Sequence, residues 1–102
     1  MELEIKKELS GATLTVFLKG KLNSGTSSQL KTELEDLSGV SELIFDLKEL
    51  GYIASAGFRV IIDAYKKVTG NNGTVKVINV NESNMEVFEY TGLTDILDIS
   101  GI

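Results

Sequence analysis

Two short apolar runs enclose a long amphipathic stretch, and this order constrains the fold more than any other feature of the chain. Residues 41–47 (SELIFDL) and 74–80 (TVKVINV) have the length and the apolar, partly β-branched composition of strands. Between them, residues 51–68 (GYIASAGFRVIIDAYKKV) carry an apolar stripe at steps of three and four residues, formed by Phe58, Ile61, Ile62, Tyr65 and Val68. A strand, a helix and a second strand in succession require a crossover. The pattern therefore predicts parallel strands at the centre of a sheet.

The flanking patterns extend this unit to an α/β domain. Residues 3–9 and 13–19 alternate apolar and polar side chains on either side of a short turn, which predicts a hairpin. Residues 29–37 and 82–92 have helical spacing, and the apolar tail fits one final strand or a turn. The expected order is β-β-α-β-α-β-α in a mixed sheet, with a loop at residues 48–53.

Small polar residues mark the expected helix starts. Asn23 or Ser24 is a plausible N-cap for the first helix, with Gly39 after its end. Ser55 stands in the N-cap position of the central helix, and Asn81 stands in that of the last helix.

The composition narrows the class of function. A chain of 102 residues predicts a single domain over residues 1–102. It contains no cysteine and no histidine, so cysteine and histidine metal sites and a Ser-His-Asp triad are absent. There is no P-loop or dinucleotide motif, so we expect no enzyme and no cofactor; a small α/β enzyme or nucleotide-binding protein is kept as an alternative.

Charge and hydropathy argue against several partners. The formal net charge is −5 and no basic stripe is present, which argues against nucleic acid and anionic membranes. The N-terminal MELEIKKELS lacks the apolar core of a signal peptide, and no apolar run approaches the ~20 residues that span a bilayer. We therefore expect a cytoplasmic protein.

Ser55 has two compatible interpretations. Its neighbours Ala54, Ala56 and Gly57 are small, so the backbone of a partner could come close. As an N-cap, its oxygen would only accept an N–H of the first helical turn. As a phosphoacceptor, it would hold about −1.5 to −2 charges at the positive end of the helix dipole, where a phosphate is well tolerated.

Three stretches of the chain resemble the STAS domain family, and within it the bacterial anti-sigma factor antagonists. They are GKLNSGTSSQLKTELEDL, LIFDLKELGYIASAGFRVII and VKVINVNESNMEVFEYTGLTDILDI, in the family's order and over nearly the whole chain. The resemblance implies a mixed sheet of four or five strands with helices mainly on one side.

The resemblance also implies a regulatory function. In the family, the unphosphorylated antagonist binds an anti-sigma factor serine kinase of the GHKL type and so frees a sigma factor that directs transcription. The kinase phosphorylates the antagonist on a serine, and a phosphatase restores it. By position, Ser55 is the phosphoacceptor. The expected partner-binding surface comprises Asn23, Ser24, Thr26, Ala54, Ser55, Ala56, Gly57, Phe58 and Arg59.

Departures from the family pattern leave an alternative open. Asn23 and Ala54 replace aspartates of the family, and Ala56 replaces a hydroxyl residue. A STAS module that binds without phosphorylation, inside a larger sensory or lipid-transport assembly, fits these changes. Arg59, the only arginine, either forms a solvated pair with Asp63 or contacts a partner carboxylate or a phosphate on Ser55.

Overall fold

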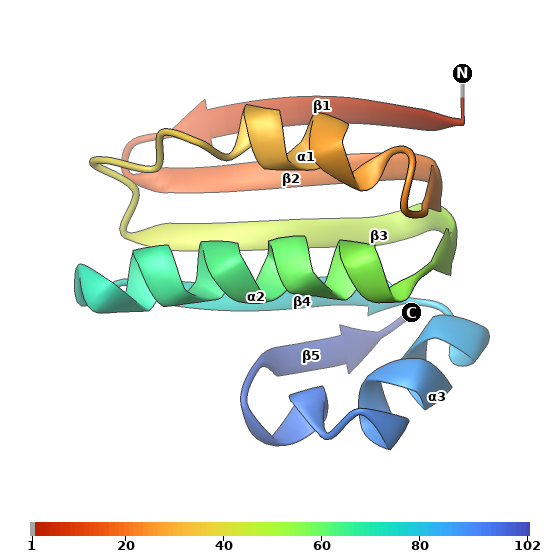
Figure 1. The fold of residues 1–102 in the computed structure, drawn as a ribbon. Helices are drawn as coiled ribbons and strands as arrows, with labels where there is room; N and C mark the ends of the chain where they lie inside the picture. The colour runs from red at the N-terminus through yellow and green to blue at the C-terminus, as the bar shows by residue number, and fades with distance from the viewer. Residues whose placement is uncertain (1) are drawn as a thin grey trace.

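Every strand of the sheet pairs with its neighbour in the sequence. The computed structural model describes residues 2–102 and gives the sheet order β1-β2-β3-β4-β5 (Figure 1). The β1–β2 pair is antiparallel and the other pairs are parallel, so the predicted hairpin and parallel centre are confirmed. The elements are β1 (Leu3–Ser10), β2 (Thr13–Leu22), α1 (Ser27–Glu33), β3 (Glu42–Ile53), α2 (Ser55–Gly70), β4 (Thr74–Val80), α3 (Glu82–Tyr90), the 3-10 helix η1 (Leu93–Asp95) and β5 (Asp98–Gly101).

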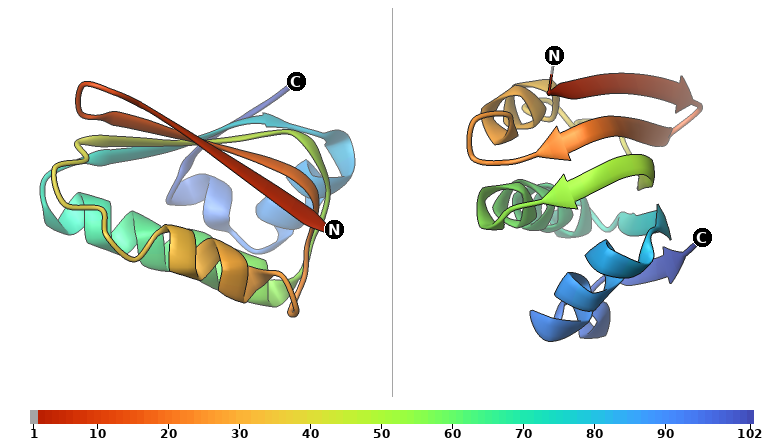
Figure 2. Two further views of the ribbon diagram at one scale, coloured as in Figure 1. Left: turned by 90° about the horizontal axis from the view of Figure 1, so that it is seen from above. Right: turned by 90° about the vertical axis from the view of Figure 1, so that its right-hand side faces the viewer.

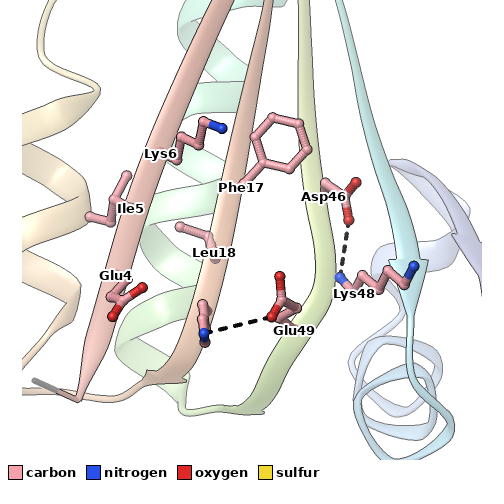
Figure 3. A pocket seen from close by; sticks show the side chains of 9 residues that line it. Glu4, Ile5, Lys6, Phe17, Leu18, Asp46, Lys48 and Glu49 are labelled. Carbon is pink, nitrogen blue, oxygen red and sulfur yellow. Dashed lines mark hydrogen bonds and ion pairs between the residues drawn. The ribbon is translucent and has the colours of Figure 1, made fainter.

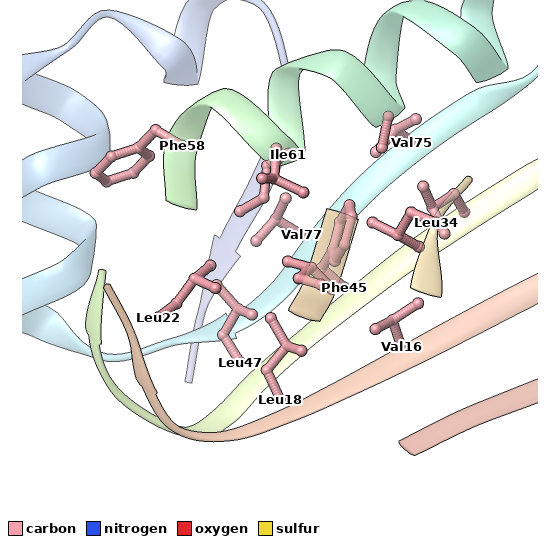
Figure 4. Close-up of a cluster of buried hydrophobic side chains, with 14 of the residues drawn as sticks. Val16, Leu18, Leu22, Leu34, Phe45, Leu47, Phe58, Ile61, Val75 and Val77 are labelled. Atoms are coloured by element: carbon pink, nitrogen blue, oxygen red, sulfur yellow. The ribbon is translucent and has the colours of Figure 1, made fainter. Parts of the chain in front are cut away.

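The helices all lie on one face of the sheet, as the family resemblance implied (Figure 2). Side chains alternate along the central strands, so every second residue points toward the helices. These residues are apolar and buried, and they form the core with the inner faces of α1, α2 and α3 (Figure 4). The strand residues in this core include Val16, Leu18, Leu43, Phe45, Leu47, Val75 and Val77.

The buried face of α2 differs in part from the predicted stripe. Phe58, Ile61 and Val68 are buried as expected, but Ile62 and Tyr65 are only half-buried. Val60 and Ala64 are buried instead, because α2 packs on the sheet and also against the segment around Leu34, which shares a groove with them. The side of α2 next to α1 is thus covered by a second element.

β3 is longer than predicted, and residues 48–53 belong to it. The sequence analysis predicts a loop there, and the apolar residues of this segment indeed do not alternate. The structure explains this with two register shifts against β2, one between Phe17 and Lys19 and one between Gly20 and Lys21. Such bulges add a residue to one strand, which breaks the alternation without ending the strand. The Asp46 carboxylate supports the first bulge by accepting the Lys48 N–H at 3.1 Å.

α1 is shorter than predicted. It ends at Glu33, although Leu34 and Leu37 are buried as a continued helix would require. The Asp36 carboxylate accepts hydrogen bonds from the N–H (3.0 Å) and the hydroxyl (2.6 Å) of Ser38, and this local turn competes with helical hydrogen bonds. The predicted end at Gly39 is therefore wrong.

The C-terminal part forms as the sequence indicates. Asn81 is the N-cap of α3 and its side chain accepts the Asn84 N–H at 2.8 Å, which confirms that prediction. The tail forms η1 and then β5. No helix within residues 2–102 has the length and apolar character needed to cross a membrane.

Candidate partner-binding surface

Three strand-to-helix connections lie at the carboxyl ends of the parallel strands. Asn23 follows β2, Ala54 follows β3 and Asn81 follows β4, at the same end of the sheet (Figure 1). This end is where open α/β sheets usually bind their ligands. The Ala54 N–H donates to the Leu22 carbonyl at 2.8 Å, which ties the start of α2 directly to the end of β2.

Ser55 is the first residue of α2 and not its N-cap. Ala54 occupies the N-cap position in an extended conformation, and no side chain caps the helix. The prediction that Ser55 caps α2 is therefore wrong, because the strand continues to Ile53 and leaves only one residue before the helix. The Ser55 side chain is exposed. Its hydroxyl does not cap the helix, and it is accessible to a modifying enzyme or a binding partner.

The Asn23 loop is fixed by its own hydrogen bonds. The Asn23 carboxamide oxygen accepts the N–H groups of Gly25 and Thr26, each at 2.9 Å. The Thr26 hydroxyl accepts the Asn23 N–H at 2.9 Å and donates to the Lys21 carbonyl at 2.8 Å. These bonds close a turn before α1, so Thr26 takes the N-cap position and neither Asn23 nor Ser24 does.

The predicted surface residues differ in their access to a partner. Thr26, Gly57 and Phe58 are buried, so they hold the surface in shape and present little side chain to solvent. The Phe58 ring packs edge-to-face on Phe88 of α3 with centroids 4.9 Å apart. The remaining members are half-buried or exposed: Asn23, Ser24, Ala54, Ser55, Ala56 and Arg59. The structure thus gathers six accessible residues around the start of α2.

Gly57 permits the close approach of α2 to β2. A Cβ atom at this position would lie 2.6 Å from Leu22 Cγ and 3.1 Å from Ile53 Cγ2, both on buried residues. A side chain there would push the first turn of α2, including Ser55, away from the end of β2.

We expect Gly57→Ala to lower the free energy of unfolding by about 1–3 kcal/mol, because the core must shift to admit the methyl group. Gly70→Ala is the matched control, since a Cβ at the last residue of α2 meets nothing within 4 Å. Alanine should be neutral or slightly stabilising there. Urea unfolding of both variants measures the difference, and equal stabilities would contradict the close packing.

Tyr52, Lys21 and Asn84 were not predicted to belong to this end of the sheet. Tyr52 lies in the segment that was expected to be a loop, and it is the register partner of Lys21. The buried Asn84 donates to the Leu50 carbonyl at 3.0 Å, which ties α3 to β3 beside the second bulge. In the sequence, the only sign that Tyr52 belongs to this surface is its position, as an aromatic residue three places before Ser55. The bulge that exposes it has no signature in the sequence.

A hollow on the opposite face of the sheet lies away from the helices (Figure 3). Its walls carry charges of both signs, and Lys19 and Glu49 form an ion pair across it at 3.9 Å. Within residues 2–102, no group of three or more carboxylates is placed to hold a metal ion. Among these features, the start of α2 is therefore the candidate functional site.

The sequence is similar to known proteins over nearly its whole length. The family model described as the STAS domain matches residues 4–101. The chain belongs to the STAS domain family. It is 28% identical over 101 residues to the anti-sigma-B factor antagonist of Bacillus subtilis, covering 98% of this chain and 93% of that protein.

Solved structures show the same fold. An anti-sigma factor antagonist from Mycobacterium paratuberculosis matches this STAS domain with a TM-score of 0.85 at 18% identity, over 98% of this chain and 86% of the other. The Bacillus cell fate determinant SpoIIAA in its phosphorylated form matches with a TM-score of 0.76 at 17% identity, over 94% and 90% of the two chains.

Proposed function

We propose that this STAS domain is an anti-sigma factor antagonist that is switched by phosphorylation of Ser55. In its unmodified form it binds an anti-sigma factor serine kinase of the GHKL type through the Asn23 loop and the start of α2, and so releases a sigma factor. The observation that carries the proposal is the exposed Ser55 hydroxyl at the first position of α2, on the surface that the Asn23 loop completes. The names of the relatives support the partner class.

The switch would act on the interface and not on the fold. The N–H groups of Ser55 and Ala56 lie in the first turn of α2, where backbone donors lack helical acceptors. A phosphate on Ser55 is therefore well tolerated by the domain itself. A partner that covers the site must instead desolvate the phosphate group, which carries about −1.5 to −2 charges, and this is costly unless the partner supplies a matching cation.

The chemistry of the transfer would belong to the kinase. Ser55 is flanked by Ala54 and Ala56, so neither neighbour can act as a base or bind a metal ion. This STAS domain would supply the acceptor hydroxyl, and the partner would supply the nucleotide and the base. A phosphatase would then return the domain to its binding form. The domain itself is thus a binding module and not an enzyme.

The two alanines also favour a second candidate. A partner that recognises half-buried Ala54 and Ala56 needs no modification of Ser55, and the domain would then be a permanent interaction module in a larger assembly. Such a module would bind with an affinity that does not change with growth conditions.

Mass spectrometry separates the two candidates. We would incubate the domain with the anti-sigma factor kinase of the same organism and ATP, and map the peptide that covers residues 51–66. We expect a phosphate on Ser55, and no modification of a Ser55→Ala variant. An unmodified wild-type domain that still binds the kinase would establish the permanent module.

A further inference from the structure

The second bulge of β3 turns an aromatic ring out of the sheet beside the proposed site. Gly20 pairs with Leu50 and Lys21 pairs with Tyr52, so Gly51 is the extra residue. Leu50 and Ile53 are buried on the helix side, whereas Tyr52 is 52% exposed. Tyr52 lies three residues before Ser55, at the same end of the sheet. An apolar ring is thus held in solvent on a hydrogen-bonded strand.

Two exposed cations at this end of the sheet are available for a partner: Lys21, the register partner of Tyr52, and Arg59 in α2. Lys6, Lys7, Lys19 and Lys76 each form an ion pair with a glutamate. In the part of the chain that the structure describes, neither Lys21 nor Arg59 forms such a pair, and both are exposed. The pair of Arg59 with Asp63 that the sequence allowed is not formed. Within residues 2–102, Lys31, Lys48, Lys66 and Lys67 form no such pair either, but Lys21 and Arg59 are the two of these cations that flank the end of β3 and the start of α2.

Lys21 also connects the ring to the Asn23 loop. Its carbonyl accepts the Thr26 hydroxyl at 2.8 Å, and its neighbour Leu22 accepts the Ala54 N–H at 2.8 Å. The backbone of Lys21 and Leu22 thus binds both parts of the proposed site, which are the Asn23 loop and the start of α2. The surface around Tyr52 is therefore connected to both parts through the backbone of β2.

We propose that Tyr52, with Lys21 beside it and Arg59 beyond Ser55, is an anchor of the partner-binding surface. The partner would present carboxylates to the two cations and an apolar recess to the phenol ring. Tyrosine and arginine are enriched among the residues that dominate binding energy in protein interfaces. The inference rests on the proposed function, because it assigns this surface to the anti-sigma factor and not to a membrane or a second copy of the chain.

The test for Tyr52 compares two exposed tyrosines. Tyr52→Ala should raise the Kd for the anti-sigma factor roughly tenfold or more, mainly through faster dissociation. Tyr90→Ala is the matched control, because Tyr90 is 93% exposed and lies at the end of α3. It should bind like the wild type. Tyr52→Phe should keep most of the affinity, since the ring remains.

The test for the cations uses association rates. Lys21→Glu and Arg59→Glu should slow association and weaken its dependence on salt, because both remove attraction to an acidic surface. Lys66→Glu, an exposed site in the second half of α2, is the control and should change the rate less. Equal effects at Lys66 would show that only the net charge matters and would overturn the assignment of an acidic partner surface.

The outcomes distinguish this inference from the proposed function. If Ser55→Asp weakens binding but Tyr52→Ala does not, the switch stands and the anchor is wrong. If Tyr52→Ala instead changes the oligomeric state of the free domain, the ring serves a second copy and the inference is overturned. If the wild-type domain does not bind the anti-sigma factor, both the anchor and the proposed function are overturned.

Discussion

If the proposed function holds, we expect Ser55→Asp to weaken binding to the anti-sigma factor by about 2–4 kcal/mol, roughly thirtyfold to a thousandfold, and Ser55→Ala to bind like the unmodified protein. The aspartate places a charge at the first residue of α2, where the partner must desolvate it. The same charge is favourable for the isolated domain, since it lies at the N-terminus of a helix. The variant should therefore be as stable as the wild type or slightly more stable.

This combination of effects separates an interface switch from damage to the fold. Calorimetric titration gives the Kd of each variant, and thermal unfolding of the free domains gives their stability. Ser100→Asp is the control, because it adds the same charge at an exposed serine of β5, two strands away from β3. It should leave the Kd unchanged. Equal affinities of the aspartate and alanine variants at Ser55 would rule out the switch.

We expect Phe88→Ala to lower the free energy of unfolding by about 3–5 kcal/mol. The Phe88 side chain is fully buried, and it packs edge-to-face on Phe58 in the first turn of α2. Removing the ring leaves a cavity between α3 and the helix that carries Ser55. We therefore expect a second effect, which is a weaker affinity for the partner even where the variant is still folded.

Chemical denaturation measures the first effect and calorimetric titration with the partner measures the second, while hydrogen exchange of the α2 amides reports whether α2 has lost support. Tyr90→Ala is again a suitable control, because it removes an aromatic ring from the same helix at a solvent-exposed position. It should change stability by less than about 0.5 kcal/mol. A Phe88→Ala variant with unchanged exchange in the first turn of α2 would contradict the proposed support of the site by α3.

The order of elements could be predicted from the sequence because periodicity records which side of an element is buried. The run around Phe45 and the stripe through Ile61 both carry this signal. The signal fails where the backbone is irregular. Asn79 has a positive φ of 58°, so Ile78 is half-buried and Val80 lies in the core, although simple alternation would place them on the same face.

The candidate site was predictable in its position but not in its details. Small residues around Ser55 indicated a helix start, and the helix does start there. Which residue caps it depends on where β3 ends, and β3 continues through two bulges to Ile53. Burial of Phe58 likewise depends on Phe88, which is 30 positions away in the chain and reaches it only through tertiary packing.

The sheet order β1-β2-β3-β4-β5 follows the order of synthesis. A nascent chain can therefore add each strand to an edge that already exists, and no strand must wait for a later one to be inserted beside it. The Ser55 segment leaves the ribosome before α3, so Phe58 then lacks the ring that covers it. We expect ribosome-bound chains that end before α3 to capture the partner poorly. On the proposed function, only chains that have completed α3 would then compete for the anti-sigma factor.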